Sequence, residues 1–239
     1  MKKIYLFIIL ALVPLISMCS GPYGPMRDGY GGYGMGPGMM GDGPGYGMMG
    51  GKDWAYRAPG QGDVASLDEA VTAFEAYVND SGYPRLGNAR LEIAEVMEVE
   101  HNYYGIAIEQ DTWIGAMELL LDKGSGVVGP EPGPNMMWNA EYGMMGGRGG
   151  MMGGYGTGAY GSGEMTLSPE EAQDVAQRWL DANVPGATAG EADLFYGYYT
   201  LHFLEDGEIA GMLSVHGGSG DVWYHSWHGD FVAMAEAHD

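Results

Sequence analysis

The sequence predicts an α+β protein of two tandem small domains, each one helix packed on an antiparallel sheet of three to four strands. The 44 glycines are concentrated in two blocks, which leave two stretches able to form cores. Each stretch opens with a helical pattern and continues with extended segments, and the two agree in order and spacing, as an internal duplication would. We therefore expect domains at 63–131 and 165–239, with disordered Gly/Met-rich linkers at 19–62 and 132–164.

Residues 1–18 have the pattern of an export signal. Lys2 and Lys3 precede an apolar run at 4–16 that is too short to span a bilayer comfortably. The next residue is Cys19, preceded by a segment similar to the bacterial lipobox, in which Met18 departs from the usual small residue. The prediction is lipidation of Cys19, which would hold the protein at a membrane surface in the periplasm or at the cell surface; the alternative is plain cleavage and a free thiol.

The linkers are rich in thioethers. Five adjacent methionine pairs lie in them: Met39 and Met40, Met48 and Met49, Met136 and Met137, Met144 and Met145, Met151 and Met152. Thioethers are soft ligands that suit Cu(I) and do not depend on protonation, so copper is the predicted cofactor. The alternatives are compositional drift in a linker and an adhesive surface for a protein partner. Trp138, isolated among these residues, is expected to dock the linker onto a domain.

The first domain is expected to begin with a helix from Ser66 to the turn at Asp80. Ser66 and Glu69 have capping-box spacing, and an apolar stripe follows at helical intervals. Extended segments are expected at 91–99, 103–109 and 113–121, with a short fourth at 127–128. The carboxylates at 92, 95, 98 and 100 are read as a solvated sheet face.

The second domain repeats this plan. Ser168 and Pro169 begin a helix whose buried stripe is Ala172, Val175, Ala176, Trp179 and Leu180. Strands are expected at 192–196, 198–204, 208–216 and 221–227, separated by glycine-containing turns.

Two phrases of the second domain, LSPEEAQDVAQRWL and YGYYTLHFLEDGEIAGMLSVHGGSGDVW, resemble the PepSY domain of exported bacterial proteins. The resemblance covers most of 65–129 and 166–228. The polar and glycine turn of that family corresponds to 122–128 and 216–222, with Ser in place of the usual Thr. The resemblance implies a helix-plus-sheet module that restrains peptidases, or that senses or binds outside the cytoplasm, and it supplies no catalytic residues.

Charge and motif content exclude several classes of function. A net charge of −22 disfavours nucleic acid as a partner, because phosphate binding depends on Lys and Arg. The simplest role of this negative charge is to keep the surface solvated, and the binding of cations is the alternative. The single cysteine permits no disulfide within the chain and no CxxC metal site, and neither GxSxG nor HExxH occurs. We therefore expect a protein that is not an enzyme.

The histidines near the end of the chain are the second candidate metal ligands. His225 and His228 are three residues apart, which puts them on one side of a turn but on opposite faces of a strand. A cluster of His216 with His225 or His228 across a hairpin is one interpretation, and packing among aromatic residues is the other.

Two functions remain from the sequence. In the first, an envelope protein binds copper through its Met pairs, with His216, His225 and His228 as supplementary ligands. In the second, the chain is an interaction module that contacts a peptidase or another envelope protein, and the methionines are only linker.

Overall fold

The computed structural model describes residues 56–57, 63–80, 89–143 and 165–236. The predicted signal, Cys19 and the methionines at 39, 40, 48, 49, 144, 145, 151 and 152 lie outside these ranges. The described residues form an α+β fold with a mixed sheet and few helices. The first half, residues 56–143, contains β1 (Tyr56–Arg57), α1 (Leu67–Asp80), β2 (Leu91–Val99), β3 (Asn102–Glu109), β4 (Gly115–Asp122), β5 (Val127–Pro130) and α2 (Pro134–Met137).

The second half, residues 165–236, begins with a helix, as the first does. Its elements are α3 (Pro169–Asn183), β6 (Thr188–Ala189), β7 (Asp193–Phe195), β8 (Tyr198–Glu205), β9 (Glu208–His216), β10 (Val222–Tyr224) and β11 (Phe231–Glu236). Both predicted helices are confirmed, and so are their starts. The amide of Glu69 donates to Ser66 Oγ at 3.3 Å, and Ser168 and Glu171 form a reciprocal capping box.

The strands form one continuous sheet, which differs from the expected pair of separate sheets. It has 11 strands, with the main order β10-β9-β8-β7-β4-β3-β2-β11. The halves meet where Gly115 of β4 pairs in parallel with Phe195 of β7. A Cβ atom at Gly115 would lie 2.5 Å from the Phe195 ring, so this junction requires glycine.

The C-terminal strand also joins the halves. β11 is the last element of the second half but pairs antiparallel with β2 of the first half, opposite residues 95–99. The sequence prediction contained no strand here, and it ended the second sheet at residue 227 instead of Tyr224. Because β10 ends early, the chain can turn at residues 225–230 and cross to β2.

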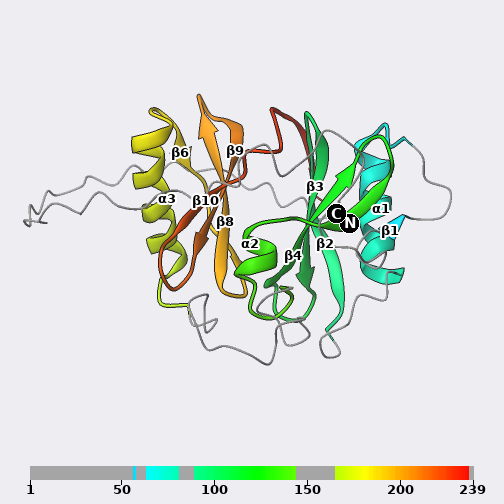
Figure 1. The fold of residues 1–239 in the computed structure, drawn as a ribbon, viewed down its shortest axis with the longest axis horizontal. Helices are drawn as coiled ribbons and strands as arrows, with labels where there is room; N and C mark the ends of the chain where they lie inside the picture. The colour runs from blue at the N-terminus through cyan, green and yellow to red at the C-terminus, as the bar shows by residue number, and fades with distance from the viewer. Residues whose placement is uncertain (1–55, 58–62, 81–88, 144–164, 237–239) are drawn as a thin grey trace, which may run out of the picture. The chain divides into compact units, whose positions relative to one another are not determined.

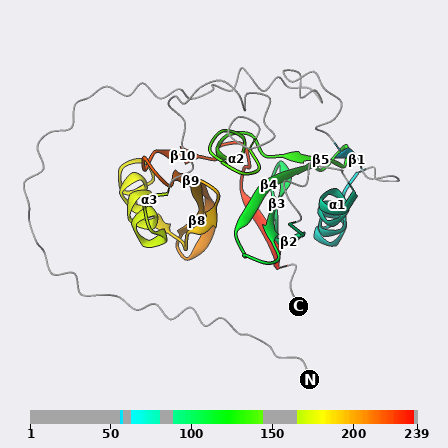
Figure 2. The same ribbon diagram turned by 90° about the horizontal axis from the view of Figure 1, so that it is seen from below.

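Apolar side chains on both faces of the strands explain why the two halves form one sheet. One face of the first-half strands packs on α1, and one face of the second-half strands packs on α3. The opposite faces form a third core that contains Met97, Tyr104, Ile106, Tyr198 and Met212, contributed by both halves. Figures 1 and 2 show α3 and α1 on the outer sides of these strands. The two halves of the continuous sheet therefore bury their second faces against each other, in a region that we call the inter-sheet layer.

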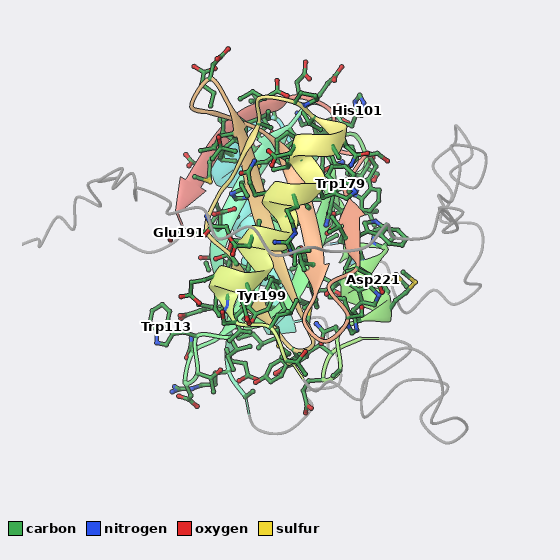
Figure 3. The ribbon with its side chains drawn as sticks, turned by 90° about the vertical axis from the view of Figure 1, so that its left-hand side faces the viewer. His101, Trp113, Trp179, Glu191, Tyr199 and Asp221 are labelled. Carbon is green, nitrogen blue, oxygen red and sulfur yellow. The ribbon has the colours of Figure 1, made fainter. Side chains whose placement is uncertain are left out.

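The outer side of the second half is an ordinary amphipathic helix on a sheet. Figure 3 looks onto α3, with Trp179 labelled beside it. The Trp179 ring stacks on Tyr224 with centroids 5.8 Å apart, while Ala172, Ala176 and Leu180 are fully buried. The predicted stripe of this helix is confirmed.

The first residues of the predicted 132–164 linker belong to the fold. α2 begins with Pro134. Asn135 within this helix and Asn139 after it are both buried. Trp138 contacts the rings of Tyr198, His216 and Trp223 edge-on, so the expected docking of Trp138 is confirmed. The composition argument for an unpacked segment was wrong for 132–143, because aromatic and amide contacts to both halves replace an aliphatic core.

Candidate metal centre

Glu131 is the central acidic group of the inter-sheet layer. It directly follows β5, and its amide donates to the carbonyl of Glu118 at 2.8 Å. Asn135 fixes both segments: its Nδ2 donates to the carbonyls of Glu118 and Glu131, and its Oδ1 accepts from the Glu118 amide at 3.1 Å. These bonds hold the Glu131 carboxylate inside the protein, with its side chain fully buried.

The turn after β10 brings two histidines to this carboxylate. The His225 amide donates to the carbonyl of Met212 at 3.2 Å, and the carbonyl of His228 accepts from the His101 amide at 3.2 Å. Gly229 has φ +76, and a Cβ there would lie 2.8 Å from the Cβ of Glu100. The turn can thus pass close to β2 only with glycine at this position.

Glu131, His225 and His228 form a compact buried cluster. Glu131 Oε1 lies 3.1 Å from His225 Nδ1 and 2.9 Å from His228 Nε2. The His225 contact is a hydrogen bond, whereas the shorter His228 contact lacks hydrogen-bond geometry. One donor atom from each of the three residues lies within 4.8 Å of the other two, and the imidazole rings stack with centroids 5.8 Å apart.

Each residue of the cluster is oriented by a second partner. Ser214 Oγ lies 2.9 Å from His225 Nε2, and Asn102 Oδ1 lies 3.2 Å from His228 Nδ1. An amide oxygen only accepts, so Asn102 favours the His228 tautomer whose Nε2 lone pair faces Glu131. Trp227 Nε1 donates to Glu131 Oε1 at 3.0 Å. Metal-binding imidazoles and carboxylates in proteins are held by outer partners of this kind.

A second buried carboxyl extends the network. Glu118 Oε1 accepts from the Tyr104 and Thr200 hydroxyls at 2.8 Å, and its Oε2 accepts from the Tyr198 hydroxyl at 2.8 Å. The Thr200 hydroxyl lies 3.0 Å from that of Ser214, which in turn contacts His225. A continuous hydrogen-bonded path through the second half therefore joins Glu118 to Glu131, both of the first half.

The two carboxyls have opposite electrostatic environments. Burial raises the pKa of Glu118, and the charge of Glu131 adds to this effect, to about 7. Burial would also raise the pKa of Glu131, but the charge and hydrogen bond of His225 outweigh it and lower this pKa to about 2. Burial likewise opposes the charge on His225, yet the carboxylate of Glu131 raises the pKa of His225 above its usual value. Glu131 is thus the ionised group, and His225 is its counter-charge.

This donor set fits a transition metal ion. Imidazole nitrogens and a carboxylate oxygen suit Zn²⁺, Cu²⁺, Fe²⁺ and Ni²⁺. Glu131 Oε2 and His228 Nε2 are buried without a hydrogen-bond partner among the described residues, which is costly unless something else binds them. A cation bound by the three residues would satisfy both atoms and take the place of the proton between His225 and Glu131.

The structure separates the predicted ligands. His225 and His228 lie together because residues 225–230 are a turn and not a strand. His216 does not reach them. Its Nδ1 accepts from the amides of Gly218 and Ser219 and closes its own turn. Met136 and Met137 lie partly buried on α2.

The sequence interpretation missed Glu118 and Glu131. Glu118 is the only charged residue in the strand segment Gly115–Leu121, GAMELLL, and a lone carboxylate in such a run must find buried partners. Glu131 stands between two prolines at the edge of the predicted linker, which concealed it. Glu95 was read as part of a solvated face, yet it is only 19% exposed and its Oε1 lies 3.4 Å from His202 Nε2.

Comparison with protein-family models, with curated proteins and with solved structures found no match. Among the residues that the structure describes, no helix is long and apolar enough to cross a membrane.

Proposed function

We propose that this chain is an exported, lipid-anchored, non-enzymatic protein of the cell envelope that binds copper. The observation that carries the proposal is the buried cluster of Glu131, His225 and His228, with each imidazole oriented by a polar partner on its other nitrogen. The Met pairs of the linkers would collect copper at the surface, and the cluster would hold it inside. Cys19 would provide attachment to the membrane.

We also propose that the two halves are divergent copies of a PepSY-like module. Supporting this, each half places one capped helix on the face of antiparallel strands. In this view the duplication created the inter-sheet layer, and the metal ligands come from the segments that join the copies: Glu131 after β5, and the turn before β11.

The test is copper titration of the mature chain with Cys19→Ser, which removes the thiol as a competing ligand. Competition with chelators for Cu(I) and for Cu(II) would be compared in three variants. The first carries His225→Gln and His228→Gln, the second carries Leu at all five Met pairs, and the third carries His216→Gln as a matched control. We expect the cluster variant to lose one tightly bound copper and the His216 variant to retain it. A cluster variant that binds as the native chain does would overturn the assignment of the site.

A second candidate function is the protein-interaction module. It is favoured by apolar side chains at the surface: Trp113 is 67% exposed, and Val232 and Met234 of edge strand β11 are 55% and 40% exposed. Unpaired strand edges accept a further strand from a partner protein. A stable complex with an envelope peptidase, unaffected by chelators and weakened by Trp113→Ser, would favour this function over copper binding.

A further inference from the structure

A cavity of about 150 Å³ adjoins the Glu131–His225–His228 cluster. It lies between β2 and β11 on one side and β9 and β10 on the other, and both His225 and His228 line it. Two methionines, Met97 of β2 and Met212 of β9, also line it. They are 1% and 2% exposed, so their thioethers belong to the interior and not to the linkers.

Each methionine is connected to one histidine of the cluster, Met212 directly and Met97 through Tyr104. The Met212 carbonyl accepts from the His225 amide at 3.2 Å, so these two residues are held side by side. Met97 pairs with Tyr104 across β2 and β3, and the Tyr104 ring meets the His228 ring edge-on at 5.4 Å. The two methionines come from opposite halves of the molecule, and they line the same cavity as the two histidines.

The donor types differ across a short distance. The cluster supplies one carboxylate and two imidazoles, which suit a divalent ion. The cavity is lined by two methionines and by the same two histidines, and thioether with imidazole is a donor set that suits Cu(I). Packing alone does not demand methionine at both positions, since leucine has a similar volume and fewer rotamers to immobilise.

We propose that the cavity is a cuprous site in which Met97 and Met212 bind Cu(I) together with His225 or His228. The inter-sheet layer would then accept copper in either oxidation state, with Glu131 serving Cu(II) and the thioethers serving Cu(I). This inference rests on the proposed copper function and deepens it, because a zinc or nickel site would gain nothing from two thioethers.

The experiment uses the full mature chain with Cys19→Ser and with leucine at the five linker Met pairs, so that sulfur ligands outside the cavity contribute less. Met97→Leu and Met212→Leu are made singly and together. Met117→Leu is the matched control, because Met117 is equally buried at 2% exposure but packs in the α1 core. Cu(I) and Cu(II) dissociation constants are measured separately by chelator competition, Cu(I) under anaerobic reducing conditions.

We expect the double variant to weaken Cu(I) binding at least about tenfold, since even outer-shell changes at metal sites cost this much. Cu(II) binding should change little, and Met117→Leu should change neither constant. An equal weakening of Cu(I) and Cu(II) binding, or unchanged Cu(I) binding, would overturn the cuprous site while leaving the copper function intact. Failure of the parent chain to bind either ion would instead reject the Glu131–His225–His228 cluster as a copper site, on which the proposed function rests.

X-ray absorption of the parent chain with one equivalent of Cu(I) gives a reading that does not depend on the variants folding. We expect sulfur and nitrogen ligands together at copper. A spectrum with nitrogen and oxygen ligands alone would overturn the assignment of Met97 and Met212.

Discussion

Glu131→Gln is the substitution that tests the buried cluster most directly. The side-chain volume is kept, but the negative charge is lost beside His225 Nδ1 at 3.1 Å and His228 Nε2 at 2.9 Å. Removing one partner of a buried ion pair leaves an uncompensated charge and costs about 3–5 kcal/mol. We expect a loss of this size in the free energy of unfolding without added metal.

The sign of the pH dependence distinguishes this mechanism from simple mispacking. In the native protein the pKa of His225 is raised, so its contribution to stability is present below its unfolded value and is lost as pH rises through the raised pKa. In the variant, burial lowers the pKa of His225, so stability is lost as pH falls. The difference between the two proteins should therefore be largest at about pH 5.5 and should shrink by about pH 8.5.

Urea unfolding followed by tryptophan fluorescence measures both quantities, since the chain contains 6 tryptophans. The matched control is Glu98→Gln, which removes a partly exposed pair with Lys123 at 2.9 Å. That pair should contribute about 1 kcal/mol or less. A Glu131→Gln loss no larger than that of the control, or one that is equal at both pH values, would refute the reasoning.

Three further substitutions or conditions test the joining of the halves and the charge of the cluster. Gly115→Ala should lower the free energy of unfolding in urea by about 1–3 kcal/mol, because the new methyl group would meet the Phe195 ring. The control is Gly207→Ala, which has open space around it and should show only the strain of its positive φ. Trp138→Ala should cost up to about 3 kcal/mol by removing the ring contacts of α2 with the second half, and unchanged stability would show that those contacts are incidental. Acidification from about pH 4.5 to about pH 2 should remove the stabilisation by Glu131, because the pKa of its carboxyl is lowered to about 2. A thermal unfolding midpoint, followed by circular dichroism, that does not change over this pH range would contradict that assignment.

Local patterns in the sequence predicted the local structure well. The capping residues Ser66 and Ser168 mark the helix starts, and strand periodicity located β2, β3, β8 and β9 to within a few residues. These features depend on contacts within a few residues, which a sequence displays directly.

Long-range features were not predictable in the same way. The pairing of β11 with β2 joins residues more than a hundred positions apart, and nothing near Phe231 announces it. Likewise the histidines at 225 and 228 were singled out, but their common partner Glu131, the last residue of the predicted first domain, was not. One feature of the sequence could have indicated the site. Glu118 is a lone carboxylate in an apolar strand, which shows that polar partners must be buried nearby.

The inter-sheet layer also bears on why charged residues persist at its centre. A buried ion pair often stabilises a fold no more than apolar side chains of the same volume do. A purely stabilising role therefore explains Glu131, His225 and His228 poorly. A core built only for stability would continue the packing of Ile106, Phe195 and Tyr198 through this region. The cluster instead leaves Glu131 Oε2 and His228 Nε2 without a hydrogen-bond partner among the described residues, and His228 lines a cavity. Because a cation that binds only the folded state stabilises it by mass action, a metal bound as we propose would offset the cost of these groups.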